Sequence, residues 1–220
     1  MGAFRVFLLA HLLGDFPCQP YALLRWKLTS IRGLLAHVGI QAALAVPVLA
    51  WLVPAWGWWL LVLVLTHFLI DWTKVRFIRG GWFELGAFFL DQALHIAVLW
   101  AIVRLSGAQV VLTGTAAAVV RWGTIFVLAG YAGAVVVFLV DAAFHPRGGG
   151  FQRIPARQWW TGMVERSVAV LAVLLLPWGV GLLAAAAYAV GAAVRLRRSE
   201  AWLPHVVSIG WVLAVTLAVT

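Results

Sequence analysis

Residues 57–75 read GWWLLVLVLTHFLIDWTKV, and this stretch decides the class of fold. It is apolar over most of its length and long enough to cross a bilayer as one helix, which takes about 20 residues. It nevertheless carries His67 and Asp71 four residues apart, a spacing that places two side chains on one face of a helix. Because ionisable groups are costly inside a membrane, the stretch predicts a functional site as well as a membrane span.

The composition of the whole chain agrees with this interpretation. Apolar residues make up 65% of the 220 residues and charged residues 10%, against about 45–50% and about 25% in soluble domains. The net charge of +9 comes from basic residues dispersed between apolar runs, a pattern that suits anionic lipid headgroups. We therefore predict a polytopic membrane protein whose partner is the lipid bilayer, with no nucleic acid bound.

The apolar runs predict an all-α transmembrane helix bundle that forms one domain over residues 1–220. The ionisable residues are expected to cluster in 1–105, while the helices of 116–220 serve for packing. An amphipathic stretch at about 20–30 is expected to lie at the membrane interface. The eight predicted membrane segments are 2–16, 33–53, 57–75, 83–105, 116–143, 158–177, 180–196 and 201–219.

Basic residues gather in every second predicted loop, which sets the orientation. Loops rich in Lys and Arg stay in the cytoplasm, so both termini are predicted outside. The residues concerned follow the first, third, fifth and seventh segments and are Arg25, Lys27, Arg32; Lys74, Arg76, Arg79; Arg147, Arg153, Arg157; and Arg195, Arg197, Arg198.

All four aspartates of the chain have a histidine four residues away. Any one aspartate would have such a neighbour by chance about one time in twenty, so the pattern is not an accident of composition. The pairs are His11/Asp15, His67/Asp71, Asp91/His95 and Asp141/His145. The predicted topology places the first three pairs, with His37, in one layer on the cytoplasmic side. The fourth pair ends a helix beside a loop and is typical of a structural contact.

Imidazole and carboxylate groups on one helical face can bind one cation together. This donor set suits zinc above all, with manganese or iron as alternatives, and the set is large enough for one or two ions. The candidate metal ligands are His11, Asp15, His37, His67, Asp71, Asp91 and His95. Asp15 and Asp91 are also candidate catalytic bases, and Lys74 is a candidate for holding an anionic substrate group. Gln19 and Gln92 are placed to orient ligands.

Several motifs in the first hundred residues occur in combination. They are Ala10-His-Leu-Leu-Gly-Asp-Phe16 with Gln19, Lys27, Ala36-His37, Thr66-His-Phe-Leu-Ile-Asp71 with Lys74, and Phe89-Leu-Asp-Gln-Ala-Leu-His95. Together they resemble DUF3307, a bacterial family of uncharacterised integral membrane proteins. The late segment Gly162-Met-Val-Glu-Arg166 is a weaker similarity. The resemblance implies a multi-pass protein of the bacterial inner (cell) membrane, and it implies no activity.

Three functions are compatible with these residues. The first is a metal-dependent membrane hydrolase that acts on a lipid or phosphorylated substrate. The second is a proton- or ion-coupled transporter that uses the same layer, although no inverted repeat of the usual kind stands out. The third is a non-catalytic assembly subunit in which the pairs bond helices together. Glu165 and Arg166 each need a partner, so either Arg166 neutralises an aspartate or Glu165 joins the site.

Overall fold

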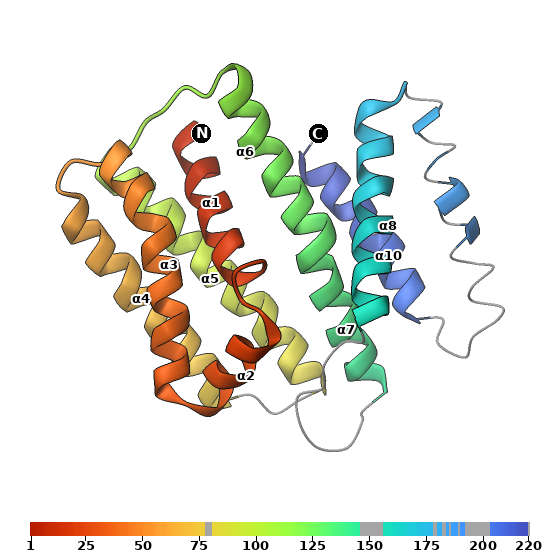
Figure 1. Cartoon of the computed structure of the whole chain (residues 1–220), viewed down its shortest axis with the longest axis horizontal. Helices are drawn as coiled ribbons and strands as arrows, with labels where there is room; N and C mark the ends of the chain where they lie inside the picture. Colours follow the sequence, from red (N-terminus) through yellow and green to blue (C-terminus); the bar gives the residue numbers. More distant parts are fainter. Residues whose placement is uncertain are drawn as a thin grey trace. The chain divides into compact units, whose positions relative to one another are not determined.

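The computed structural model describes residues 1–77, 81–145, 156–177 and 203–219, together with a few positions between 180 and 191. Helices make up almost all of these described residues, and no strand occurs among them, which confirms the predicted all-α class. The chain divides into two compact units (Figure 1). Unit 1 comprises Met1–Arg79 and Gly86–Thr124, and unit 2 comprises Gly80–Leu85 and Ile125–Thr220.

Unit 1 is built on the long helix α3 (Ile31–Leu52), which packs against α1 (Gly2–Asp15), α2 (Tyr21–Thr29) and α4 (Trp56–Phe77). Helices α5 (Gly81–Ser106) and α6 (Gly114–Phe126) follow. The chain runs in one direction through α1 and α4 and in the opposite direction through α3 and α5 (Figure 1). This antiparallel arrangement decides which ends of the helices meet.

The turn between α2 and α3 is fixed by Ser30. Its backbone is extended, which stops α2, and its side chain accepts a hydrogen bond from the backbone N–H of Arg32. This is the usual capping contact at a helix N-terminus. The short helix α2 coincides with the stretch predicted at 20–30. The tight turn after it lets the side chain of Lys27 lie in the interior of unit 1, where it is buried.

In the described part of the chain, three helical stretches are long and apolar enough to cross a membrane, namely Ile31–Leu52, Gly81–Ser106 and Gly114–Phe144. These correspond to three of the eight predicted segments and support association with a membrane. The other five stay predictions, and the one at 180–196 lies mostly outside the described residues. The stretch Gly114–Phe144 contains a π-helical turn, η1 (Val127–Ala132), between α6 and α7 (Gly133–Phe144), which the hydropathy pattern did not predict.

A compact apolar core holds α1, α3, α4 and α5 of unit 1 together. Phe7, Leu49, Leu63 and Leu99 are buried in it, one from each of α1, α3, α4 and α5. On α1, α4 and α5 the core residue lies one helical turn from the histidine of the pair, since the spacing is four residues each time. The packing that aligns these apolar side chains therefore also aligns the ionisable ones.

Unit 2 contains η1, α7, α8 (Ala156–Leu175) and α10 (Leu203–Val219). Helix α8 packs on the π-helical turn, where Arg166 donates to the backbone carbonyls of Ala129 and Gly130 at 2.9 and 3.0 Å. The indole N–H of Trp211 in α10 donates to the carbonyl of Leu128 at 2.8 Å. A π-turn disturbs the regular hydrogen bonding of a helix, and these side chains satisfy carbonyls in it.

Candidate metal centre

The three predicted pairs of the first hundred residues meet in unit 1. Each pair lies along one helix, and its two side chains contact each other: His11 with Asp15, His67 with Asp71, and His95 with Asp91. The order is His then Asp in α1 and α4 but Asp then His in α5. Because α5 runs the opposite way, all three carboxylates lie at the same end of the helices. The imidazoles of His11, His67 and His95 lie one turn further, towards the apolar core.

One group of donor atoms has separations in the range found between the ligands of a metal ion. The Nε2 atoms of His37 and His67 are 3.1 Å apart, and both face Asp71 Oδ2, at 3.3 and 3.2 Å. Asp15 Oδ1 is 3.4 Å from His37 Nε2 and 3.9 Å from His67 Nε2. Ligands of a tetrahedral zinc ion with bonds of 2.0–2.2 Å are about 3.4 Å apart. Five of the separations among these four atoms lie near that value.

A second group lies beside the first. Asp15 Oδ2 is 3.5 Å from His11 Nε2, and the rings of His11 and His95 are 4.9 Å apart between centroids. His95 Nδ1 is 2.9 Å from the backbone carbonyl of Asp91. A carbonyl only accepts, so Nδ1 carries the ring proton and Nε2 presents a bare lone pair. This is the tautomer that a metal-binding histidine needs.

Two glutamines hold the carboxylate of Asp15. The amide of Gln41 on α3 donates to Asp15 Oδ1 and to the backbone carbonyl of His11. The amide of Gln92 on α5 donates to Asp15 Oδ2 at 2.9 Å and to Asp91 Oδ2 at 3.1 Å. Hydrogen bonds of this kind fix the orientation of metal-ligating carboxylates.

Two lysines neutralise the other two carboxylates. Lys27 Nζ is 2.7 Å from Asp71 Oδ1, and Lys74 Nζ is 2.7 Å from Asp91 Oδ2. In both aspartates the second oxygen, Asp71 Oδ2 or Asp91 Oδ1, has no hydrogen-bond partner among the described residues. Each lysine thus keeps one oxygen occupied and leaves the other directed at the imidazoles.

The cluster is deeply buried, which weighs against a purely structural role. All seven predicted ligands are at most 8% exposed. A network that only bonds helices together is expected to pair its buried polar atoms, since an unpaired one costs about 1–3 kcal/mol. Among the described residues, five side-chain atoms of the cluster lack a hydrogen-bond partner: His11 Nε2, His37 Nδ1, Asp71 Oδ2, Asp91 Oδ1 and His95 Nε2. Several of these are the atoms that a metal ion would use.

The structure brings together all the residues that the sequence singled out in unit 1, but not all of them belong to a group of possible metal ligands. Six of the seven ligands fall into three groups whose donor atoms lie within 4.8 Å of one another. The groups are His11, Asp15, His95; Asp15, His37, His67; and His67, Asp71, His95. Asp91 belongs to none of the groups found among the described residues and instead contacts Lys74 and Gln92. Gln19 accepts from Lys27 at 3.3 Å and donates to the carbonyl of Asp15 at 3.1 Å.

Sequence reasoning missed two members of the cluster. Gln41 lies four residues after His37, so the spacing that revealed the His/Asp pairs would have found it had amides been included. Lys27 was assigned to orientation in the membrane as one of several basic loop residues. Its burial, at 5% exposed, and its contact with Asp71 show that it belongs to the site.

The remaining candidates lie in unit 2. His145 Nδ1 is 3.2 Å from Asp141 Oδ1 at the end of α7, and the histidine is half-exposed. Arg166 is occupied with the π-helical carbonyls described above.

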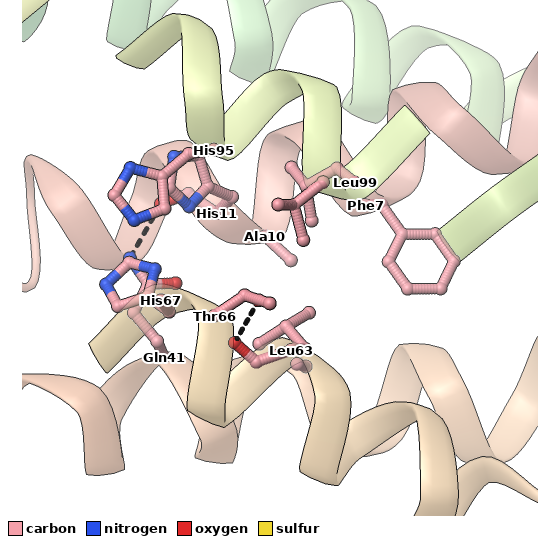
Figure 2. Close-up of a pocket in the computed structure, with 11 residues that line it drawn as sticks. Phe7, Ala10, His11, Gln41, Leu63, Thr66, His67, His95 and Leu99 are labelled. Atoms are coloured by element: carbon pink, nitrogen blue, oxygen red, sulfur yellow. Dashed lines mark hydrogen bonds between the residues drawn. The ribbon is translucent and has the colours of Figure 1, made fainter. Parts of the chain in front are cut away.

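A pocket adjoins the imidazoles on the side of the apolar core. Figure 2 shows His11, His67 and His95 gathered at one end of it and Phe7, Leu63 and Leu99 towards the other. Gln41 and Thr66 also line it. The pocket therefore joins a polar, metal-competent end to an apolar end.

These features define a class: an all-helical protein with membrane-length apolar helices and a buried His/Asp cluster able to hold a metal ion. Within that class the chain belongs to DUF3307, described as a protein family of unknown function, whose profile matches residues 3–121. The matched segment contains the whole cluster, from His11 to His95. Comparisons with curated proteins and with solved structures found no match.

Proposed function

We propose that the cluster of unit 1 binds a divalent metal ion, with zinc as the first candidate and manganese or iron as alternatives. The observation that carries this proposal is the group of donor atoms from His37, His67, Asp15 and Asp71, in which five separations lie between 3.1 and 3.9 Å. Two imidazoles and two carboxylates are a donor set that zinc accepts. The ion would also serve as the partner of buried donor atoms that have no hydrogen bond among the described residues.

We further propose that the chain crosses the bacterial inner membrane in about eight segments and that the site faces the cytoplasm. The alternation of basic and non-basic loops supports this topology. Within the cluster, Lys74 is the most exposed of the charged groups, at 21% of its side chain, and it lies at the carboxylate end. That end is the one which the topology directs to the cytoplasm.

The reaction that these parts suit best is hydrolysis of a lipid carrying a phosphate ester. A divalent ion polarises a phosphoryl group and activates a water molecule at neutral pH. The water oxygen attacks phosphorus, the ester P–O bond breaks, and the lipid alcohol leaves with a proton. The pocket beside the imidazoles has room for a water molecule, the nucleophile that this reaction needs. Asp15 and Asp91 are the candidate bases for the proton transfers.

Metal analysis of the purified protein tests the proposal. The detergent-solubilised chain is stripped with a chelator, reloaded with zinc or manganese, and its bound metal measured by mass spectrometry. We expect stoichiometric metal in the parent and a loss in the His37→Ala/His67→Ala double variant. The matched control is His145→Ala, which removes an imidazole from unit 2 and should keep the parent's content. Absence of metal from a folded, monodisperse parent refutes the proposal.

Activity is measured next, as phosphate released from a phosphorylated lipid in mixed micelles, with a soluble phosphomonoester as comparison. Release from the lipid that needs metal and fails in the double variant supports the hydrolase. A metal-loaded protein that cleaves neither compound refutes the hydrolytic function while leaving the metal site standing.

The second candidate function is an ion- or proton-coupled carrier. It is favoured by the unbroken series of ionisable groups from the partly exposed Lys74, through Asp91 and His95, to the pocket. Series of this kind conduct protons inside membranes. Metal or proton flux into proteoliposomes, lost in His95→Ala, would support the carrier over the hydrolase.

A further inference from the structure

We infer that the cluster is a dinuclear metal centre in which the carboxylate of Asp15 bridges two ions, one through each oxygen. The inference rests on the proposed metal binding and concerns how many ions the site takes, which residue links them, and what kind of substrate it can accept.

The two oxygens of Asp15 face different histidines. Oδ1 lies 3.4 and 3.9 Å from the Nε2 atoms of His37 and His67. Oδ2 lies 3.5 Å from Nε2 of His11. The carboxylate thus stands between two sets of imidazoles, and a single ion would satisfy only one of them.

The lone pairs of Asp15 also allow bridging. A carboxylate oxygen can accept about two partners. Gln41 donates to Oδ1 and Gln92 donates to Oδ2. One acceptor position on each oxygen remains for a metal ion, and the two amides hold the carboxylate in the orientation that presents both.

The histidines divide between two ions without conflict. His37 and His67, with Asp71 and Asp15, give the first ion four ligands. His95 approaches both groups, but its Nε2 has one lone pair and can bind one ion. Assigned to the second ion, it completes a set of three with His11 and Asp15. Four ligands close a site, whereas three leave a position open for water or substrate.

The open ion would lie next to the pocket. His11 and His95 of the second ion both line the pocket, whereas His67 is the one residue of the first ion's set that does. The water molecule or phosphate oxygen that takes the open position would therefore lie on the side of the second ion, with the first ion behind it. This division resembles the general arrangement in which two ions clamp the attacking and the leaving oxygen of a phosphoryl group.

The charge of the loaded centre names the substrate class. Two divalent ions, with Lys27 and Lys74, outweigh the three carboxylates of Asp15, Asp71 and Asp91. A centre with excess positive charge in a buried site needs an anion to neutralise it. A phosphate group that bridges both ions meets this need, and a neutral ester does not.

Counting the ions and testing their coupling decides the question. The parent chain loaded with Mn²⁺ should bind two ions per chain, and its electron paramagnetic resonance spectrum should show an exchange-coupled pair. His11→Ala should bind one ion and show the spectrum of an isolated ion. Asp15→Asn, with one ligating oxygen, should lose the coupling. The control His145→Ala should retain two coupled ions.

Each outcome is decisive. No bound ion in the folded parent overturns both this inference and the proposed function. One isolated ion overturns the dinuclear centre and leaves the metal site intact. Two ions without coupling overturn the bridge. The measurement on the parent needs no variant, so the inference stays testable even if His11→Ala fails to fold. Inorganic phosphate added to the loaded parent should change the coupled spectrum, and an unchanged spectrum would overturn the substrate class.

Discussion

The buried ion pair of Lys27 and Asp71 gives the sharpest prediction about stability. The two charged atoms are 2.7 Å apart, and the side chains are 6% and 2% exposed. In the variant Lys27→Met, the apolar stem is kept and the ammonium group is removed. The carboxylate of Asp71 then stays buried with one oxygen unpaired, in addition to the oxygen that already lacks a hydrogen-bond partner.

The expected loss follows from the cost of a buried charge without its partner. Breaking a buried ion pair on one side costs about 3–5 kcal/mol. For a chain of this size each kcal/mol lowers the melting temperature by about 2–4 °C, so the loss is about 6–20 °C. Lys74→Met should cost less, because Lys74 is 21% exposed and water can reach the pair it forms with Asp91.

Thermal unfolding of the metal-free protein in detergent, followed by circular dichroism, measures the effect. The matched control is Arg25→Met on the same helix, where the exposed basic residue should be dispensable. The double variant Lys27→Met/Asp71→Asn should recover most of the loss, since it removes the unpaired charge. If Lys27→Met and Arg25→Met have the same melting temperature, removing the ammonium group leaves no costly buried charge, and the reasoning is refuted. If the double variant is as unstable as the single, the lysine acts through packing and not through charge.

Three further substitutions test how the site is positioned. Gly14→Ala should weaken metal binding about 10-fold or more, because the added methyl would overlap the amide of Gln41 and displace it from the carboxylate of Asp15. Isothermal titration calorimetry measures the affinity for the metal, and an unchanged affinity contradicts the role of the amide. Gly33→Ala should lower the melting temperature, because its methyl would overlap the backbone of α2. The control Gly39→Ala should leave the melting temperature unchanged, because its methyl meets nothing within 4 Å. Equal melting temperatures of the two variants would contradict the close approach of α2 and α3. Arg166→Met should destabilise unit 2 by about 2–5 kcal/mol, because it removes two hydrogen bonds from a charged group to the π-helical carbonyls, yet its metal content should match the parent's. A loss of metal would contradict the assignment of the site to the residues of unit 1 alone.

Much of the site was readable from spacing alone, because the helix imposes the geometry. Two residues four apart must share a face. Once His67/Asp71 and Asp91/His95 were placed on consecutive helices of opposite direction, both pairs fell in one layer. In the structure the rings of His67 and His95 are 4.2 Å apart between centroids, and the opposite directions of the helices put both carboxylates at one end. The family membership was likewise carried by these motifs and is confirmed by the match over residues 3–121.

The atoms that face each other could not be predicted, because they depend on how helices rotate and approach. No spacing rule states that His37 and His67 would meet at 3.1 Å or that Asp91 would turn to a lysine. Hydropathy also gave no sign of the π-helical turn, since an inserted residue changes the hydrogen bonding of a helix without changing its apolar character. The count of eight spans stays a prediction beside the three membrane-length stretches.

The glycines of α1 and α3 connect the fold to the chemistry of the site. Gly14 lies one residue before Asp15, and its missing side chain is what admits the amide of Gln41. Gly33 lets α2 approach α3 closely enough for Lys27 to reach Asp71. A larger residue at either place would displace the neighbouring group, which at Gly33 is the backbone of α2. These glycines therefore serve the packing of the helices together with the placement of an amide and an ammonium group on two carboxylates. The close approach of the helices therefore serves the orientation of the carboxylate oxygens, and the metal-binding proposal explains why that orientation is needed.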